Sequence, residues 1–214
     1  ISIVDGAHAP SQIPLDLREV GADIYAGACH KWLCAPKGSA FLYARPEAQR
    51  RLEPLVVSRG WRKESPDPET GTGETSTLVE YHEGQGTRDL SAFLSVPAAI
   101  DFQAQNDWNA VRQRCHALAS STRQRISALT GLEPLCPDSA DWFSQMVSVC
   151  LPGVDLHLLS QHLYNACRIE VPVGKWNGQP LIRVSFQAYN SQEDADALVE
   201  ALEELLPQMW PEGN

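Results

Sequence analysis

Apolar residues gather in three short segments within the first 45 positions of the chain, at Ile1–Val4, Asp23–Gly27 and Ala40–Ala44. Glycine and proline residues lie between these segments. Short apolar runs bounded by turn-forming residues are typical of neighbouring strands in a mostly buried sheet. The pattern therefore predicts three strands of one sheet in this part of the chain.

The first of these segments has the pattern of a buried strand that is already under way. Ile1-Ser2-Ile3-Val4-Asp5 has no initiator Met and no other element before it. In βαβ proteins a functional strand normally belongs to a larger set of packed elements. We therefore expect upstream residues to be missing from this chain, because they were deleted, cleaved or placed on a second chain.

The middle of the chain changes from a loop pattern to a helical one. Residues 58–89 hold seven Gly and Pro residues and many Thr, Ser and Glu, which predicts a long loop. From Ser91 the pattern turns helical, and apolar side chains recur at steps of three and four from Trp108 onward. This spacing predicts a long helix near residues 107–129 that ends at Gly131.

The last part of the chain, residues 132–214, alternates strand and helix patterns, which predicts a compact α+β segment. Ser191-Gln192-Glu193-Asp194 has the spacing of a helix capping box. The predicted elements are strands at Gln145–Leu151, Ile169–Val173 and Leu181–Phe186, a helix capped by Asp155, and a helix from Ser191 that stops at Pro207.

Composition narrows the class of protein. The chain has 214 residues, 43% of them hydrophobic and 21% charged, which is an ordinary globular balance. Its net charge of −10 gives no general attraction to nucleic acid or to an anionic membrane. No apolar run reaches the roughly 18 residues of a membrane span, and no signal peptide is visible. The six scattered cysteines are interpreted as reduced thiols of a cytoplasmic protein.

Two charged residues follow predicted strands, and together they indicate a chemistry. Asp5 closes the first strand, and Lys31 lies just past the second. The carboxyl ends of strands in an open α/β sheet line its ligand crevice. Pyridoxal phosphate requires such a pair, an amine to form a Schiff base and a carboxylate to keep the pyridine nitrogen protonated. Burial beside Trp32 and Leu33 would favour the unprotonated amine.

The same residue types also have structural interpretations. A loop lysine is most often a solvated surface residue, and an Asp after a strand is most often a turn or a helix cap. His8 and His30 are each more often structural than catalytic. Cys29-His30 with Cys34 fits no common zinc spacing, so no metal site is predicted.

The order of residues around Asp5 and Lys31 also resembles that of a known family. Asp5-Gly6-Ala7-His8, followed by Cys29-His30-Lys31-Trp32-Leu33-Cys34-Ala35-Pro36-Lys37-Gly38, resembles the cofactor motif of class V aminotransferases. The residue motif around the lysine is similar to that of the isopenicillin N epimerase-like branch. The resemblance continues in Gly86-Thr87-Arg88-Asp89 and in the stretch from Leu181 to Asn190. These proteins are type I-fold pyridoxal-phosphate enzymes.

The resemblance implies a fold and a division of the chain. Residues 1–106 correspond to the C-terminal portion of the α/β cofactor-binding large domain. Residues 107–130 correspond to a linking helix, and residues 131–214 to a small α+β domain. The upstream half of the family's fold, which adds phosphate contacts and a residue stacked on the ring, has no counterpart in this sequence.

The resemblance also implies roles for the residues around the cofactor. Lys31 forms the Schiff base and moves protons at the substrate Cα. Asp5 pairs with the pyridine nitrogen, His8 lies against the ring hydroxyl, and His30 contacts the phosphate. Many relatives have a hydroxyl residue where this chain has Ala28, so one phosphate contact is lost or replaced.

Two further residues receive roles in the same way. Thr87 lies in a loop that, in the family, reaches the cofactor of the partner subunit, which implies a homodimer. Arg183 binds the carboxylate of an amino acid substrate, a task that suits its planar guanidinium. A turn role for Thr87 and a structural ion pair for Arg183 remain as alternatives.

The reaction stays open among four outcomes, which are epimerisation, transamination, β-elimination such as C–S lysis, and cysteine desulfuration. Desulfuration needs a thiol on a mobile loop near the substrate arginine. The segment Val171–Gly178, which precedes Arg183, has no cysteine, and Cys167 lies just ahead of a predicted strand. Desulfuration is therefore disfavoured. The resemblance to the isopenicillin N epimerase-like branch favours an epimerase or an aminotransferase-like enzyme. A C–S lyase and a truncated, non-catalytic chain are the rival interpretations.

Overall fold

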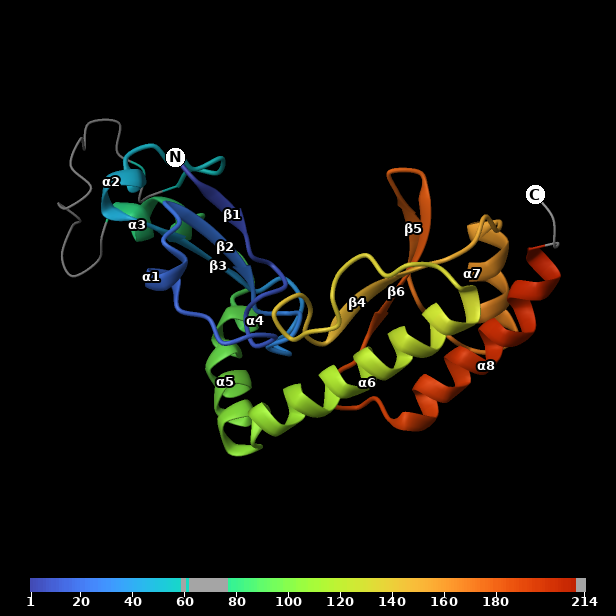
Figure 1. Cartoon of the computed structure of the whole chain (residues 1–214). Coiled ribbons are helices and arrows are strands. Elements are labelled where there is room, and N and C mark those ends of the chain that lie inside the picture. The colour runs from blue at the N-terminus through green and yellow to red at the C-terminus, as the bar shows by residue number, and fades with distance from the viewer. Residues whose placement is uncertain (59–60, 62–76, 211–214) are drawn as a thin grey trace. The chain divides into compact units, whose positions relative to one another are not determined.

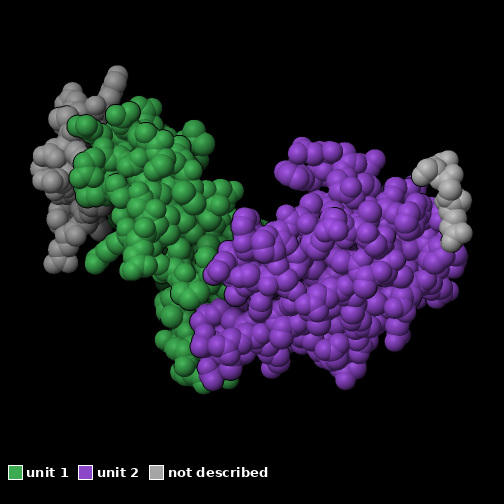
Figure 2. Space-filling view, viewed as in Figure 1, with its two compact units in different colours: residues 1–106 green, residues 107–214 purple. Residues whose placement is uncertain are grey.

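The computed structural model describes residues 1–58, 61 and 77–210. The chain divides into two compact units, Ile1–Asn106 (unit 1) and Asp107–Asn214 (unit 2). Unit 1 is green and unit 2 purple in Figure 2. The assignment of these parts as a large domain, a linking helix and a small domain stays a prediction.

Unit 1 contains a three-stranded sheet, as the apolar segments predicted (Figure 1). Its strands are β1 (Ile3–Asp5), β2 (Ile24–Ala28) and β3 (Ala40–Ala44), in the order β1-β2-β3. β1 runs parallel to β2, and β2 runs antiparallel to β3. Because β1 and β2 are parallel, the residues that follow both strands emerge at the same edge of the sheet.

The prediction that Ile1–Asp5 is a buried strand is wrong. Ile3 is 71% exposed and Ile1 is 66% exposed. β1 is an edge strand of the sheet, and within the described residues the face that carries Ile3 has little cover. An apolar pattern therefore identified the strand but not its burial.

The helices of unit 1 are short. α1 (Leu17–Val20) lies between the two parallel strands, capped by Asp16 at its start and by Gly21 at its end. The other helices are α2 (Pro46–Gln49), α3 (Thr77–Glu83), α4 (Ser91–Leu94) and α5 (Val96–Gln105).

The predicted loop over residues 58–89 is only partly described. Its positions 59–60 and 62–76 lie outside the described residues. Within the described part the prediction missed α3, in which Thr77 is buried.

Unit 2 contains a second three-stranded sheet, which is antiparallel throughout. Its strands are β4 (Met146–Cys150), β5 (Val173–Trp176) and β6 (Gln179–Ser185), in the order β4-β6-β5. Three strands were expected in this part of the chain, but the second of them, β5, begins at Val173, where the predicted strand ended.

Beyond Val173, where the predicted strand ends, the structure continues as a β-hairpin. β5 and β6 form a hairpin whose two turn residues are Asn177 (φ 48°) and Gly178 (φ 82°). Asn-Gly is the preferred pair for a two-residue hairpin turn, because both positions require positive φ. This signal was present in the sequence.

Three longer helices complete unit 2: α6 (Trp108–Thr130), α7 (Leu156–Asn165) and α8 (Gln192–Met209). α6 packs on β4 and on α8 (Figure 1). The caps predicted at Asp155 and Ser191 are confirmed, the latter as a full capping box with Asp194. Gly131 ends α6 in the left-handed conformation, as predicted.

Pro207 does not stop α8, although its sequence position suggested a stop. The helix continues to Met209, and the Trp210 N–H still donates to the Leu206 carbonyl. A proline costs a helix one backbone hydrogen bond. Here the buried Leu205 and Leu206 hold the last turn against the core of unit 2, which offsets that loss.

Candidate functional site in unit 1

The loop that carries Lys31 begins where β2 ends, and the His8 loop begins where β1 ends. Asp5 pairs with Ala26 in the parallel register, and the Gly6 N–H donates to the Ala26 carbonyl at 2.9 Å. The two loops therefore leave the sheet from the same edge, as expected for the carboxyl ends of parallel strands.

A hydrogen-bonded pair joins these loops. The Lys31 Nζ lies 3.0 Å from the His8 Nε2. The indole Nε1 of Trp32 donates to the His8 Nδ1 at 3.2 Å. Lys31 and His8 are half-buried, whereas Trp32 is only 7% exposed. Both ring nitrogens of His8 are therefore engaged by neighbouring residues of the lysine loop.

Backbone hydrogen bonds fix the shape of the lysine loop. The Cys34 N–H donates to the Lys31 carbonyl at 3.1 Å, and the Ala35 N–H donates to the Cys29 carbonyl at 3.0 Å. Cys34 adopts a positive φ of 64° to make this turn. The loop thus presents Lys31 from a closed turn and not from a loose segment.

Helix α5 secures the same loop from another direction. The Gln103 Nε2 donates to the Trp32 carbonyl at 3.0 Å, and the Gln103 Oε1 accepts from the Ser11 hydroxyl. Gln103 is itself buried at 8% exposure. One buried amide therefore ties the His8 loop and the Lys31 loop together.

His30 is anchored to the backbone at the base of the loop. Its Nδ1 lies 2.9 Å from the carbonyl oxygen of buried Ser39, so Nδ1 carries the proton and donates. In the neutral ring Nε2 is then an acceptor. To donate to a phosphate oxygen as well, the Nε2 of His30 must also carry a proton.

Asp5 is exposed, and its Oδ1 accepts from the Ala7 N–H at 3.0 Å. This is the local turn role that an Asp after a strand often plays. Burial raises the pKa of the neighbouring Tyr25 hydroxyl, and the negative charge of Asp5 raises it further. A side chain at Gly6 would lie 1.9 Å from the Tyr25 hydroxyl, so only glycine fits there.

Thr87 and Arg183 lie away from this hydrogen-bonded group along the chain. Thr87 is exposed in the segment between α3 and α4, just after Gly86 with its φ of 87°. Arg183 belongs to β6 in unit 2, directly opposite Ser148 of β4. It is exposed, whereas its neighbours Ile182 and Val184 on the other face of the sheet are buried.

Arg183 lines a pocket of about 330 Å³ in unit 2. The pocket lies among the segment before β5, the end of β6 and the first turns of α8. Its polar lining includes Arg168, Asn190 and Asp194, and Cys167 is also part of it. The nearest thiol that the sequence offered therefore shares a pocket with Arg183.

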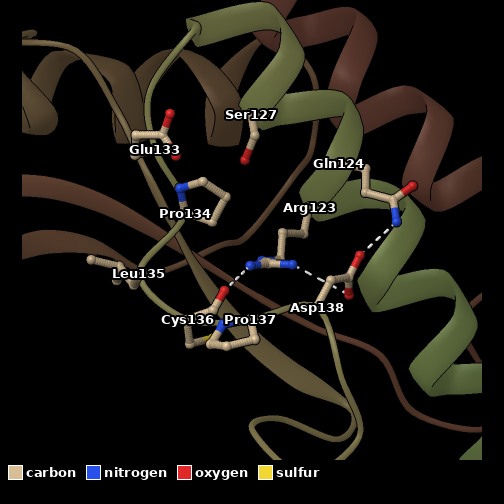
Figure 3. A pocket seen from close by; sticks show the side chains of 9 residues that line it. All are labelled: Arg123, Gln124, Ser127, Glu133, Pro134, Leu135, Cys136, Pro137 and Asp138. Atoms are coloured by element: carbon tan, nitrogen blue, oxygen red, sulfur yellow. Dashed lines mark hydrogen bonds and ion pairs between the residues drawn. The ribbon is translucent and has the colours of Figure 1, made fainter.

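Figure 3 shows a larger, more open pocket of about 640 Å³, also in unit 2. The guanidinium of Arg123 lies between the Cys136 carbonyl and the carboxylate of Asp138, and Gln124 also binds Asp138. None of the residues predicted for the site lines this pocket. Its ionic pair fastens the segment after α6 to the helix.

Sequence reasoning missed two polar contributions to the site. Trp32 was considered only as an apolar neighbour of Lys31, yet its indole N–H binds His8. Gln103 was not singled out, because it lies 71 residues from its partner Trp32. An indole next to the lysine was a usable signal, whereas the Gln103 contact depends on the tertiary fold.

The side chains present match what pyridoxal phosphate requires of this loop. A half-buried primary amine lies beside an imidazole, and a second imidazole and a carboxylate follow the same two strands. In the described part of the chain no group of three or more His, Cys, Asp or Glu residues is arranged to hold a metal ion.

Comparison with known proteins identifies the family. Residues 1–198 match Aminotransferase class-V, so the chain belongs to this family, whose members depend on pyridoxal phosphate. It is 41% identical over 208 residues to isopenicillin N epimerase of Amycolatopsis lactamdurans, covering 96% of this chain and 52% of that protein. It is 31% identical to a probable chloroplastic L-cysteine desulfhydrase of Arabidopsis thaliana, covering 95% and 44%.

The fold agrees with this family. The cysteine desulfurase of Thermococcus onnurineus NA1 superposes with a TM-score of 0.77 at 21% identity, covering 97% of this chain and 52% of that one. The predicted mixed α/β class and the family resemblance are confirmed. The chain spans about half the length of the relatives it matches.

Two further properties concern the cysteines and the helices. All six cysteines lie in the described residues, and none of them forms a disulfide. Among the described helices, none combines the length and the apolar character that crossing a membrane requires.

Proposed function

We propose that this chain forms the lysine-bearing part of a pyridoxal-phosphate-dependent enzyme that acts at the Cα of an amino acid as an epimerase. The observation that carries the proposal is the 3.0 Å contact between the Lys31 Nζ and the His8 Nε2 at the edge where β1 and β2 end. A lysine that meets an imidazole in a closed loop is positioned for chemistry, whereas a solvated surface lysine has no such partner.

When bound, the cofactor supplies an electron sink that stabilises negative charge at the substrate Cα. Lys31 holds it covalently and moves the Cα proton at its Nζ. Asp5 keeps a proton on the ring nitrogen, and His8 donates from Nε2 to the ring hydroxyl. His30 binds the phosphate in its doubly protonated form, because its Nδ1 is engaged by Ser39.

Substrate binding and assembly complete the proposal. Arg183 binds the substrate carboxylate, and its exposed guanidinium in the 330 Å³ pocket supports this role. The protein is proposed to act as a cytoplasmic homodimer in which Thr87 approaches the cofactor of the partner subunit. The exposed position of Thr87 is consistent with such a contact.

Epimerisation is favoured over other outcomes because the relative named isopenicillin N epimerase is 41% identical over 96% of this chain. Elimination at a C–S bond is the second candidate. One observation favours it: a relative at 31% identity is named a probable L-cysteine desulfhydrase.

The covalent role of Lys31 is tested by adding pyridoxal phosphate, reducing with borohydride and mapping the label by mass spectrometry. We expect a visible absorption band and a label on Lys31 alone. Lys31→Ala abolishes both. The matched control is Lys37→Ala, since Lys37 is an exposed lysine of the same loop. A label on Lys37 or on any other lysine would disprove the assignment.

The same experiment separates an active chain from an incomplete one. If the band appears only after a separately produced upstream fragment is added, this chain is a non-catalytic piece of a larger enzyme. In that case Lys31 still takes the label within the reconstituted complex.

The type of reaction is tested with L-amino acids in deuterium oxide. Deuterium at Cα with inversion of configuration identifies an epimerase. Release of pyruvate from cysteine identifies the C–S lyase instead, and formation of a 2-oxo acid with retained nitrogen on the cofactor identifies an aminotransferase.

The role of Arg183 is tested by Arg183→Ala, with Arg168→Ala in the same pocket as the control. We expect Arg183→Ala to raise the KM at least tenfold, because a charge-assisted carboxylate contact is lost. The absorption band of the attached cofactor should be unchanged. Loss of that band would indicate a structural role for Arg183.

A further inference from the structure

Trp32 determines which nitrogen of His8 carries the proton. An indole N–H is a donor and never an acceptor. Because the Trp32 Nε1 lies 3.2 Å from the His8 Nδ1, that nitrogen must present its lone pair. The neutral ring of His8 then carries its single proton on Nε2.

The proton on Nε2 points at Lys31. The His8 Nε2 and the Lys31 Nζ are 3.0 Å apart, so one of them must donate and the other accept. With Nε2 protonated, only the unprotonated amine of Lys31 offers a lone pair. An ammonium group at the same place would set two donors against each other.

The surroundings hold Trp32 in the orientation that this arrangement needs. Its side chain is 7% exposed, and its carbonyl accepts from the Gln103 Nε2 at 3.0 Å. Gln103 is in turn bonded to Ser11, three residues after His8. The backbone of Trp32 and the loop that follows His8 are therefore both tied to the same buried amide of α5.

We propose that Trp32 is a positioning residue that keeps His8 protonated on Nε2, so that before an aldehyde binds His8 donates to Lys31 and favours its unprotonated amine, the form that adds to an aldehyde. The tautomer follows from the contacts alone. Only the aldehyde rests on the proposed function. Other ionisable groups are Asp5 and Tyr25 on the adjoining strands, and Cys29, His30, Cys34 and Lys37 within the lysine loop itself.

The tautomer is measured by NMR of the ¹⁵N-labelled chain without cofactor, through long-range correlations of the histidine ring at about pH 8, above the ordinary histidine pKa. The His8 signals are assigned by their loss in His8→Gln. We expect the Nε2-protonated pattern for His8. An Nδ1-protonated or doubly protonated His8 would overturn the proposal.

The influence of Trp32 is tested by Trp32→Phe, with the exposed Trp142→Phe as the matched control. We expect Trp32→Phe to populate both His8 tautomers and to slow capture of Lys31 by pyridoxal phosphate about tenfold, the effect of one hydrogen bond. Trp142→Phe should change neither. Unchanged tautomer populations and capture rate in a folded Trp32→Phe would overturn the proposal.

Replacing Trp32 by benzothienylalanine separates the N–H from the shape of the side chain, because sulfur takes its place in the ring. This variant should reproduce the effect of Trp32→Phe while keeping the packing, and it also covers the case in which phenylalanine prevents folding.

If His8 has the expected tautomer but Lys31 takes no label, the proposed function fails and the Trp32 inference stands. If Lys31 takes the label but His8 has the opposite tautomer, the proposed function stands and the Trp32 inference fails.

Discussion

Units 1 and 2 differ in how they hold their structures together. The largest fully buried side chains of the described residues all belong to unit 2, including Ile182 and Leu202. In unit 1 the hydrophobic cluster consists of Ile24, Ala44 and Ala48 with two partly buried neighbours. The loops around Lys31 are instead fixed by hydrogen bonds.

The proposed reactive residues Lys31 and His8 therefore lie in unit 1, whereas the larger hydrophobic core lies in unit 2. Burial of apolar area stabilises a fold by about 25 cal/mol per Å², and among the described residues most of the buried apolar side chains lie in unit 2. Unit 1 also leaves large apolar side chains exposed, such as Ile3 and Leu94, at 71% and 77%. We therefore expect unit 1 to respond strongly to polar changes and unit 2 to changes of volume.

The largest expected effect comes from shortening the same residue type in both sheets. Ile182→Ala in β6 removes a side chain with no exposure and should lower the free energy of unfolding of unit 2 by about 2–5 kcal/mol. Ile3→Ala in β1 should change stability by less than about 0.5 kcal/mol. Hydrogen exchange of the strand amides reports on each unit separately. Equal effects at both sites would contradict the comparison.

A second comparison concerns ion pairs. In unit 2 Arg123 is 4% exposed and pairs with Asp138, whereas in unit 1 the side chains of Arg45 and Asp23 are 43% and 32% exposed. Asp138→Asn leaves the buried guanidinium without a counter-charge and should cost about 1–3 kcal/mol. Asp23→Asn should have a smaller effect. Urea denaturation followed by hydrogen exchange distinguishes the two units.

The same aspartate gives a pH dependence with a defined sign. The hydrogen bond from Gln124, and then Ser120 and the charge of Arg123, hold the pKa of Asp138 below its usual value. Its contribution is therefore complete above the unfolded pKa, near pH 4, and is lost as the pH falls through the folded pKa. The stability of unit 2 should fall more gently with acid in Asp138→Asn. Glu133→Gln, in the same pocket, serves as the control.

What the sequence revealed also differs between the two units. In unit 2 the periodic pattern predicted α6, the caps at Asp155 and Ser191, and the positions of the strands, because its apolar residues are buried within the unit itself. The errors at Pro207 and in the β5–β6 hairpin came from giving local signals the wrong weight. Packing of Leu205 and Leu206 keeps α8 helical past Pro207, and the hairpin signal of Asn177-Gly178 was not used.

In unit 1 the pattern located the strands but failed on burial, as Ile3 shows. The contact between Lys31 and His8 was not predicted by spacing, since 23 residues separate them. It depends on the parallel pairing of β1 with β2, which brings two distant loops to one edge. The link from Gln103 to Trp32 needs the path of α5, which no local motif encodes.

Helix caps provide the third comparison. Ser191 begins the 18-residue α8 with a capping box, and Asp16 caps the four-residue α1. Ser191→Ala should cost unit 2 about 1 kcal/mol, because the Asp194 N–H loses its acceptor. Asp16→Ala should lead to local fraying of α1 without a change in the global unfolding of unit 1. Amide exchange rates at the first turn of each helix measure both effects.

The smallest expected effect is a gain in stability, and it again contrasts the two units. Arg168 in unit 2 and Cys34 in unit 1 have φ values of 61° and 64°, a conformation that costs most residues about 1–2 kcal/mol. Arg168 follows α7, where its N–H donates to the Tyr164 carbonyl, so Arg168→Gly should raise stability by about 0.5–1 kcal/mol.

Cys34→Gly relieves the same strain but loosens the turn that presents Lys31, so capture of pyridoxal phosphate should slow while stability changes little. Chemical denaturation and the rate of pyridoxal phosphate capture are measured on both variants. They test whether the strained turn at Cys34 increases the rate at which Lys31 reacts. An unchanged capture rate in Cys34→Gly would show that the strained turn has no such role.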